Sequence, residues 1–230
     1  MPFVDFSCRL NGESIPADHG YLLYAALSKH LPSLHPPERQ VLDLQHQSTD
    51  VPLWLSSGIH PIRGKLIGDR RLAVTPQSRL TLRIPSGRIQ EVLSLIGTKL
   101  VLGESTISVG TPEILQLVAR PRLYSRLVVI KGATEASHFL QTATRQLEAL
   151  GIRAQVGIPY KQAAARVEGG APDQDQPAVL RRTINIAGKV IVGFALLAEG
   201  LTAEESITLQ EQGLGGRRRF GCGVFIPALP

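Results

Sequence analysis

The chain has 230 residues, of which 43% are hydrophobic, and this is enough for one large domain or two small ones, each with its own core. Lys and Arg total 25 against 19 Asp and Glu, which gives a formal charge of +6 and suits a polyanionic partner. The sequence has no apolar run of about 20 residues for crossing a bilayer and no secretory signal, so we expect a cytoplasmic protein with no membrane partner. Cys8 and Cys222 have no CxxC partner for zinc, and we expect both to be free thiols.

The first half of the sequence predicts the order strand, helix, strands, helix, strands. Residues 2–10 alternate apolar and polar side chains and predict a strand, and residues 21–31 carry an apolar stripe at helical spacing. Asp18 can cap this helix, and Pro32 stops it because proline lacks an amide hydrogen. The other elements predicted here are strands over 63–67 and 80–84, a shorter helix over 87–96, and strands over 99–102, 106–109 and 114–119.

The second half repeats that order. Residues 127–130 form a β-branched run that predicts a strand, and residues 135–150 carry the clearest amphipathic helix, with Gly151 just past its end. Thr202 and Glu205 have the spacing of a capping box at the start of a later helix. The other elements predicted here are a strand over 152–158, a flexible loop over 169–177, a hairpin of strands 179–186 and 190–197 around Gly188, a helix over 202–212 and a closing strand over 224–226.

Two consecutive βαββαβ patterns are typical of paired ferredoxin-like domains, so the sequence predicts an α+β fold with two such domains in tandem. We place the junction near Arg120-Pro121-Arg122, which gives domains over residues 1–120 and 121–230. The two halves share no residue-level repeat, so the predicted duplication is one of architecture.

The densest signal is the segment Gly213-Leu214-Gly215-Gly216-Arg217-Arg218-Arg219-Phe220-Gly221-Cys222-Gly223, which we call the glycine-rich segment. Glycine allows positive φ and close backbone approach, and exposed amides and guanidinium groups can grip phosphates. The segment is no Walker loop, because no Gly-Lys-Ser/Thr closes it, and its helix-loop-strand order does not fit a dinucleotide fingerprint. The competing interpretation is a tight glycine turn with a solvated basic tip.

The spacing of Gly213-Leu214-Gly215, five residues, then Gly221-Cys222-Gly223 resembles the C-terminal glycine-rich signature of CRISPR repeat-specific endoribonucleases. These enzymes belong to the wider repeat-associated RNA-binding (RAMP) superfamily and process crRNA in type I systems. The family consists of two tandem ferredoxin-like domains with this signature between the last helix and the last strand. The resemblance therefore covers nearly the whole chain in architecture, although only the glycine-rich segment carries it as a specific motif.

The resemblance implies a metal-independent endoribonuclease that needs no cofactor. In such enzymes the 2′-hydroxyl upstream of the scissile phosphate attacks it, the 5′-oxygen leaves, and a 2′,3′-cyclic phosphate remains. A base, an acid and a cation serve this reaction, and histidine suits the proton transfers. The implied partners are CRISPR repeat RNA, often a stem-loop, the mature crRNA and a multi-subunit type I effector complex.

The family's catalytic histidine commonly lies within or just after the first helix, and a tyrosine in that helix assists. By this resemblance His35 is the expected general acid or base and Tyr24 its helper. His60 is the main rival and His19 follows, whereas the surroundings of the other histidines favour a surface role or give no clear indication: His30, His46 and His138. The family's third catalytic residue, often a lysine, has no clear match, and Arg39 or Lys65 could take its place.

Several arginines and glycines are candidates for binding the RNA backbone, which supplies most non-specific affinity and makes it salt-sensitive. The candidates are Gly213, Gly215, Gly216, Arg217, Arg218, Arg219 and Gly221 of the glycine-rich segment, Arg181 and Arg182 at the hairpin, and Arg120, Arg122 and Arg126 near the predicted junction. The alternative function is a non-catalytic RNA-binding subunit of an effector complex. A metabolic α+β enzyme would need a phosphate-site lysine or a metal cluster, and the sequence offers neither.

Overall fold

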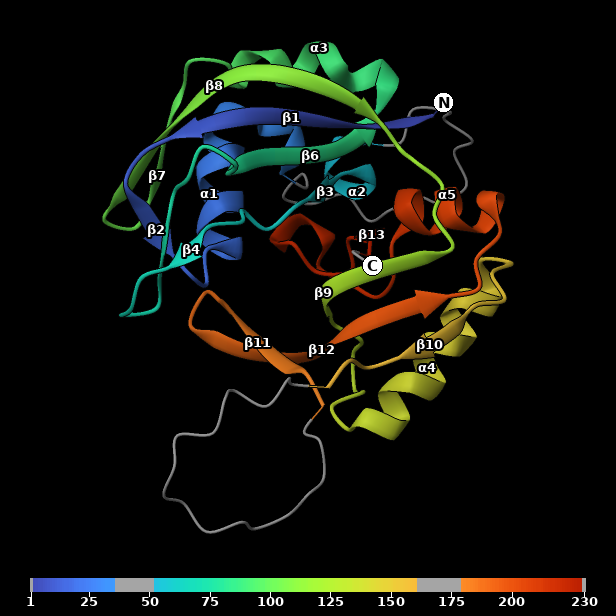
Figure 1. Ribbon diagram of the computed structural model, residues 1–230. Helices are drawn as coiled ribbons and strands as arrows, with labels where there is room; N and C mark the ends of the chain where they lie inside the picture. The colour runs from blue at the N-terminus through green and yellow to red at the C-terminus, as the bar shows by residue number, and fades with distance from the viewer. Residues whose placement is uncertain (1, 36–51, 161–178, 229–230) are drawn as a thin grey trace, which may run out of the picture. The chain divides into compact units, whose positions relative to one another are not determined.

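The computed structural model describes residues 2–35, 52–160 and 179–228 of the chain. These residues form two compact units that are interleaved in sequence (Figure 1). The first unit comprises residues 1–118, 185–189 and 217–221, and the second comprises residues 119–184, 190–216 and 222–230. The glycine-rich segment therefore contributes to both units, because residues 217–221 belong to the first and its two ends to the second.

A five-stranded antiparallel sheet forms the centre of the first unit, in the order β3-β6-β1-β8-β7. Its middle strand β1 (Phe3–Asn11) pairs with β6 (Arg79–Pro85) and β8 (Ser105–Gln116), as the blue and green ribbons of Figure 1 show. The edge strands are β3 (Gly58–Ile59) and β7 (Lys99–Leu102). A second, smaller sheet joins β2 (Ser14–Pro16), β5 (Arg71–Ala73) and β4 (Lys65–Leu66).

Alternation along β1 separates an apolar face of the sheet from a polar one. Val4, Phe6, Cys8 and Leu10 are buried on the apolar face. Asp5 and the residues that alternate with it point the other way, and the register places Asp5 opposite Arg83 of β6. The helical elements of this unit are α1 (Gly20–His30), η1 (Pro32–Leu34), α2 (Leu53–Ser56), η2 (Ser86–Arg88), α3 (Ile89–Val92), η3 (Leu93–Leu95) and η4 (Arg218–Phe220).

The second unit has an antiparallel sheet in the order β10-β12-β9-β13, with β11 paired to β12. Phe139 of helix α4 (Ala136–Ala149) and Phe194 pack at 4.9 Å between ring centroids within a buried apolar cluster. Helix α5 (Ala203–Gln212) begins with the predicted capping box of Thr202 and Glu205. The strands are β9 (Arg122–Val128), β10 (Gln155–Gly157), β11 (Arg181–Ile186), β12 (Lys189–Glu199) and β13 (Ile226–Pro227).

Both sheets have the strand order of a ferredoxin-like domain. If the four main strands of each βαββαβ unit are numbered along the chain, both sheets read 2-3-1-4, namely β3-β6-β1-β8 and β10-β12-β9-β13. The predicted α+β fold with two ferredoxin-like domains is therefore confirmed. None of the helices in the described ranges is long and apolar enough to cross a membrane. Cys8 and Cys222 are buried free thiols.

Several predicted elements differ in detail from the structure. The strands predicted at 106–109 and 114–119 are one strand, β8, which continues through Pro112. Proline is tolerated there because β7 pairs only as far as Ser108, so beyond that point β8 is an edge strand on that side. The helix predicted at 87–96 is a succession of short turns, η2, α3 and η3, and the strand predicted at 63–67 keeps only Lys65–Leu66.

The predicted cap of the first helix is also wrong. His19 occupies the N-cap position of α1, without a side-chain cap. The Asp18 carboxylate instead accepts a hydrogen bond from the Asn185 amide, at 2.8 Å. The predicted flexible loop over 169–177 lies outside the described residues.

Candidate functional site

His35 and Tyr24, the predicted catalytic residues, lie together at the end of the first helix. Helix α1 stops at His30, and η1 follows from Pro32, so the chain turns back toward the helix; the His35 amide donates to the Pro32 carbonyl at 2.9 Å. The rings of Tyr24 and His35 are stacked, with centroids 6.4 Å apart and an interplanar angle of 29°. Tyr24 is buried and its hydroxyl donates to the Leu34 carbonyl at 3.4 Å, whereas His35 is exposed.

The tip of the glycine-rich segment reaches the same tyrosine. Phe220 meets Tyr24 edge to face, with centroids 5.0 Å apart at 86°, and Tyr21 lies 5.9 Å from the Phe220 ring. The Arg219 guanidinium carbon is 5.3 Å from the Tyr24 centroid and 5.1 Å from that of Phe220. His35, Tyr24, Arg219 and Phe220 therefore form one group, which we call the tyrosine cluster. The sequence did not indicate that Arg219 would join Tyr24.

Backbone geometry explains the glycines of this segment. Gly221 has φ +84°, and a Cβ there would lie 3.1 Å from the Pro61 side chain. At Gly215, with φ +70°, a Cβ would lie 2.4 Å from the Val129 carbonyl oxygen, and at Gly223 only 2.0 Å from that of Leu214. A side chain at Gly215 or Gly223 would collide with a neighbouring backbone, and at Gly221 the positive φ and the close Pro61 ring disfavour one. Packing alone thus accounts for these three glycines, independently of any ligand.

Only part of the glycine-rich segment is open to a ligand. Gly213, Leu214 and residues 220–223 are buried, with the Gly213 amide donating to the Leu209 carbonyl at the end of α5. Gly215, Gly216 and Arg217 are exposed, and Arg218 and Arg219 are half-buried. Arg217 has left-handed backbone angles, φ 68° and ψ 32°, which are uncommon for a residue with a side chain. Of the predicted RNA contacts here, Gly213 and Gly221 are therefore enclosed.

Arg218 lies in a different environment from its two neighbours. Its Nε and Nη2 atoms are buried and have no hydrogen-bond partner among the described residues. Burial and the nearby charge of Arg83 lower the pKa of Arg218 to about 10. Of the three consecutive arginines, one is thus exposed, one faces the interior of the first unit, and one lies on the tyrosine cluster.

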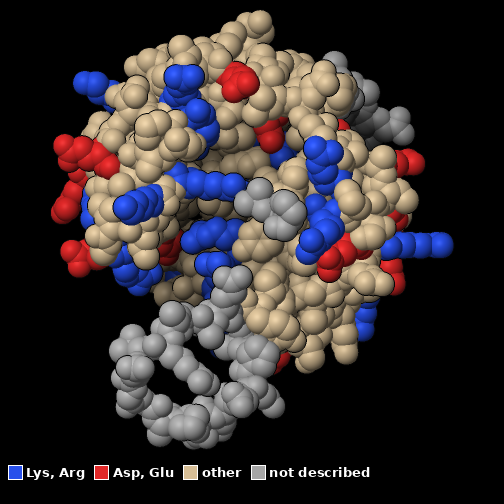
Figure 2. Space-filling model, viewed as in Figure 1, with Lys and Arg blue, Asp and Glu red and all other residues tan. Residues whose placement is uncertain are grey.

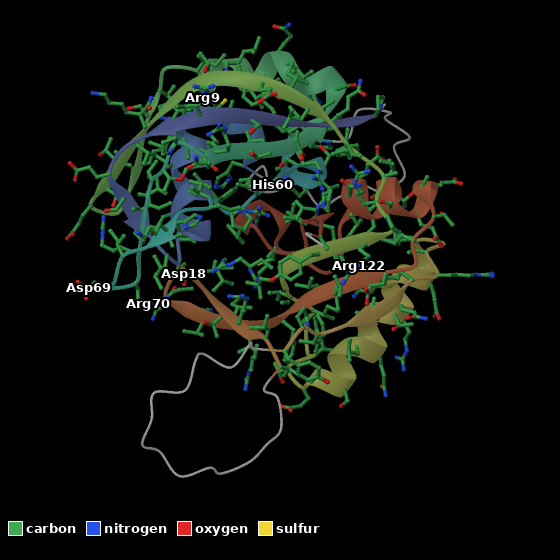
Figure 3. All side chains as sticks on the ribbon, in the orientation of Figure 1. Arg9, Asp18, His60, Asp69, Arg70 and Arg122 are labelled. Atoms are coloured by element: carbon green, nitrogen blue, oxygen red, sulfur yellow. The ribbon has the colours of Figure 1, made fainter. Side chains whose placement is uncertain are left out.

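His60, the main rival for the catalytic role, is labelled in Figure 3 and belongs to a separate group that is mostly buried. Arg83 donates from Nε and Nη2 to the two carboxylate oxygens of Asp5 at 2.8 and 2.9 Å, and Nε2 of His60 lies 3.4 Å from Asp5 Oδ1. We call Asp5, His60, Arg83 and Arg218 the buried ionic cluster.

The ionisation of this group follows from its surroundings. Burial would raise the pKa of Asp5, but the side chains of His60 and Arg83 outweigh it and hold that pKa well below its ordinary value. Burial lowers the pKa of His60, although Asp5 opposes the effect. At neutral pH the cluster therefore contains an ionised Asp5 and an uncharged His60.

His19 has a structural role. It is 2% exposed, and both ring nitrogens are engaged. The Ile62 amide donates to Nε2 at 2.9 Å, so the proton of the neutral ring is on Nδ1, which lies 3.0 Å from the Pro16 carbonyl. The ring thereby ties two distant stretches of the first unit together. His30 and His138 are exposed, and His46 lies outside the described residues.

The other predicted contacts lie elsewhere. Arg181 and Arg182 open β11 in the second unit, and Arg182 Nε is buried without a hydrogen-bond partner in the described part of the chain. Arg122 is paired with Glu199 at 2.7 Å, so a carboxylate already neutralises it (Figure 3). Lys65 is in β4 of the small sheet, and Arg39 falls outside the described ranges.

Charge distribution alone does not delimit the site. Figure 2 shows Lys and Arg side chains over much of the face drawn, with Asp and Glu side chains also present. Within the described ranges, no three or more His, Cys, Asp or Glu side chains gather closely enough to hold a metal ion. The arrangement of the tyrosine cluster, rather than net charge, therefore distinguishes the candidate site.

Comparison with known proteins agrees with this architecture. A family model described as Cas6 Crispr matches residues 4–229. The CRISPR-associated endonuclease Cas6 of Myxococcus xanthus (strain DK1622) is 35% identical over 227 residues, which are 99% of this chain and 82% of that protein. A solved structure of a CRISPR associated protein Cas6 has a TM-score of 0.60 at 11% identity and covers 99% of both chains. A Cas6-related protein from Pyrococcus furiosus has a TM-score of 0.59 at 11% identity, covering 97% of this chain and 98% of the other. The solved structures agree in fold, and the family model and the M. xanthus relative show that the chain belongs to the Cas6 family.

Proposed function

We propose that this protein is an endoribonuclease that cuts CRISPR repeat RNA within precursor transcripts and so produces mature crRNA. The observation that carries the proposal is the tyrosine cluster, which holds an exposed imidazole, His35, and a guanidinium, Arg219, against one aromatic ring. Membership of the Cas6 family and the name of the M. xanthus relative, an endonuclease, support it.

The proposed reaction uses the RNA itself as the nucleophile. The 2′-oxygen attacks the adjacent phosphorus, the bond from phosphorus to the 5′-oxygen breaks, and the products end in a 2′,3′-cyclic phosphate and a 5′-hydroxyl. One proton must leave the 2′-hydroxyl and one must reach the 5′-oxygen. This balance needs no redox partner, and we propose that it needs no metal ion either. DNA cannot react in this way because it lacks the 2′-hydroxyl.

His35 is the residue that we assign to proton transfer. It is the exposed histidine of the tyrosine cluster, whereas His60 is mostly buried beside Asp5 and both nitrogens of His19 are occupied. An imidazole can give or take a proton near neutral pH. Tyr24 is better described as a positioning residue, because its hydroxyl already donates to the Leu34 carbonyl while its ring contacts His35.

RNA binding is assigned to the exposed part of the glycine-rich segment. Gly215, Gly216 and Arg217 are exposed, and so is Arg181 at the start of β11. The amides of Gly215 and Gly216 already donate to the Gln146 side chain and the Val129 carbonyl, so we assign phosphate binding here to the Arg217 guanidinium, with the two glycines leaving room for the RNA backbone. Arg182, the next residue of β11, belongs to the same predicted set and is half-buried. Such contacts to phosphate make affinity depend on salt without reading sequence. Stem-loop recognition, crRNA retention, a cytoplasmic location and a type I effector complex remain predictions.

The test is cleavage of a synthetic RNA that carries the repeat of the host's CRISPR array. The purified chain should cut it at one position in EDTA, and a single 2′-deoxy substitution at the scissile nucleotide should abolish cleavage while leaving binding intact. Acid treatment, which opens cyclic phosphates, should change the mobility of the upstream product. Tight binding without any cleavage would instead favour the non-catalytic RNA-binding subunit. Cleavage that stops in EDTA would contradict the metal-independent reaction.

A further inference from the structure

We infer that Arg219 is a catalytic residue of this reaction and supplies the positive charge that stabilises the attacked phosphate. The inference rests on the proposed function and adds the cation that His35 and Tyr24 do not provide. Its first support is position: the guanidinium carbon is 5.3 Å from the centre of the Tyr24 ring, and that ring is stacked with His35. A single aromatic side chain thus contacts both the proton-transfer group and a cation.

The second support is that Arg219 keeps its charge available. No Asp or Glu in the described part of the chain pairs with it, and its guanidinium lies on the rings of Tyr24 and Phe220. A ring face orients a guanidinium without using its hydrogen-bond donors, so the donors remain for a ligand. Arg83 offers the contrast, because both oxygens of Asp5 already accept its donors.

The third support is the way in which the segment fixes this side chain. The amides of Phe220 and Gly221 donate to the carbonyls of Arg217 and Arg218 at 2.9 and 3.0 Å, which closes the turn η4. Left-handed residues bound the turn, Arg217 with φ 68° and Gly221 with φ 84°. Phe220 anchors the turn on Tyr24 edge to face. Because the turn fixes the backbone and two rings contact the guanidinium, Arg219 has less entropy to lose when a phosphate binds.

The chemistry favours a guanidinium at this place. As the 2′-oxygen bonds to phosphorus, negative charge grows on the two non-bridging oxygens before the 5′-oxygen leaves with its proton. A guanidinium stays charged throughout and can donate two parallel hydrogen bonds to two oxygens of one phosphate. Of the cations that the sequence offered for this role, Lys65 lies in the small sheet and Arg39 falls outside the described residues. Arg219 is the cation that the structure places on Tyr24.

The experiment compares Arg219→Met and Arg219→Lys with the unchanged protein in single-turnover cleavage of repeat RNA in EDTA. Methionine keeps an unbranched stem on the two rings, so folding should survive, and thermal unfolding checks this. We expect Arg219→Met to lower the cleavage rate at saturating RNA by about 10²–10³-fold, the cost of losing one preorganised donor. Arg219→Lys should recover part of that loss. Arg70→Met is the matched control, because Arg70 is exposed at the turn between β4 and β5 (Figure 3) and should leave the rate unchanged.

Two further readouts separate catalysis from structure and from binding. Millimolar guanidinium added in solution should partly restore cleavage by Arg219→Met and leave Arg70→Met unaffected. The dissociation constant, measured with 2′-deoxy RNA, should change only a few-fold. A normal rate at saturating RNA in Arg219→Met, or a loss that appears only in the dissociation constant, would overturn the inference while the proposed function stands. An unchanged protein that binds repeat RNA and never cuts it would overturn both.

Discussion

The first unit contains two groups that each combine a histidine with at least one arginine and that differ in the exposure of the histidine. The tyrosine cluster has an exposed histidine, His35, and an arginine on aromatic rings. The buried ionic cluster has a mostly buried histidine, His60, and two arginines, of which Arg83 is only 1% exposed. Each contains one arginine of the glycine-rich segment, Arg219 and Arg218 respectively. These two neighbouring arginines, both half-buried, thus contact different groups of side chains.

The comparison shows that residue type alone does not indicate whether a group of side chains serves catalysis or stabilises the fold. In the buried ionic cluster Asp5 already satisfies Arg83 with two hydrogen bonds, and burial keeps His60 uncharged. In the tyrosine cluster the ring of Tyr24 holds its neighbours without neutralising Arg219. The buried ionic cluster is therefore suited to stabilising the fold, and the tyrosine cluster is suited to binding a substrate.

The largest expected effect comes from exchanging the two histidines for glutamine. His35→Gln should lower the cleavage rate at saturating RNA by about 10²–10⁴-fold, because it removes a proton-transfer group, and should spare RNA affinity. His60→Gln should cut at nearly the normal rate if it folds. Single-turnover kinetics with circular dichroism on the same samples checks both. His30→Gln, at the exposed last residue of α1, is the control. The reverse ranking of the two variants would move the catalytic role to His60.

The fold was predictable from the sequence wherever local signals agreed with burial. Three local signals are present in the structure as predicted. The alternation of β1 and the apolar face of α4 indicate which side of each element faces the core, and the Thr202–Glu205 capping box indicates where a helix begins. The elements that differ depend on distant partners. Pro112 lies within β8 because of where β7 ends, and Asp18 binds Asn185 rather than capping α1. The local sequence indicates neither of these long-range contacts.

The candidate site was predictable only in part. The order of helix, Pro32 and His35 indicates that a histidine follows the first helix, and the resemblance selected it together with Tyr24. The contact of Arg219 with Tyr24 joins residues 195 positions apart, so spacing could not indicate it. The sequence did not indicate that the Arg218 side chain is buried either. Three consecutive arginines look alike in a sequence, and it is the turn η4 that points their side chains in different directions.

The buried ionic cluster should matter most for stability. Asp5→Asn leaves Arg83 without a carboxylate, and removing one partner of a buried pair costs about 3–5 kcal/mol. Urea unfolding at pH 7 measures this directly. Glu199→Gln is the matched control, because its pair with Arg122 is about half exposed and should contribute under about 1 kcal/mol. Equal losses in the two variants would mean that the two groups do not differ in the way that burial implies.

A smaller effect concerns acid. A group whose pKa is lower in the folded state stabilises the fold above its ordinary pKa and loses this contribution as the pH falls. His60 therefore destabilises the fold progressively below its ordinary pKa of about 6.5, and Asp5 does so only below about 4. Between pH 7 and 5 the free energy of unfolding falls by at most about 2 kcal/mol because of His60, since each pH unit below the ordinary pKa changes it by at most about 1.4 kcal/mol. Urea unfolding of His60→Gln should show a flatter decline over this range, and His138→Gln, at an exposed position, should follow the unchanged protein.

The smallest effect separates strain from binding at Arg217, the exposed arginine at the start of the turn. A side chain in the left-handed region costs about 1 kcal/mol, so Arg217→Gly should raise the free energy of unfolding by somewhat less than that, since glycine also gains freedom in the unfolded chain. Arg217→Ala keeps the strain and loses the charge, so its stability should not change. Both variants should weaken RNA binding and reduce the slope of log affinity against log salt by about 0.7–0.9, the value for one lost phosphate contact.

If Arg217→Gly stabilises the protein while binding keeps its full salt dependence, the strained arginine does not contact RNA, and the exposed part of the segment is only a solvated basic tip. If both variants bind less tightly and only the glycine variant is more stable, the strain at this position accompanies function, as strained backbone at ligand sites often does.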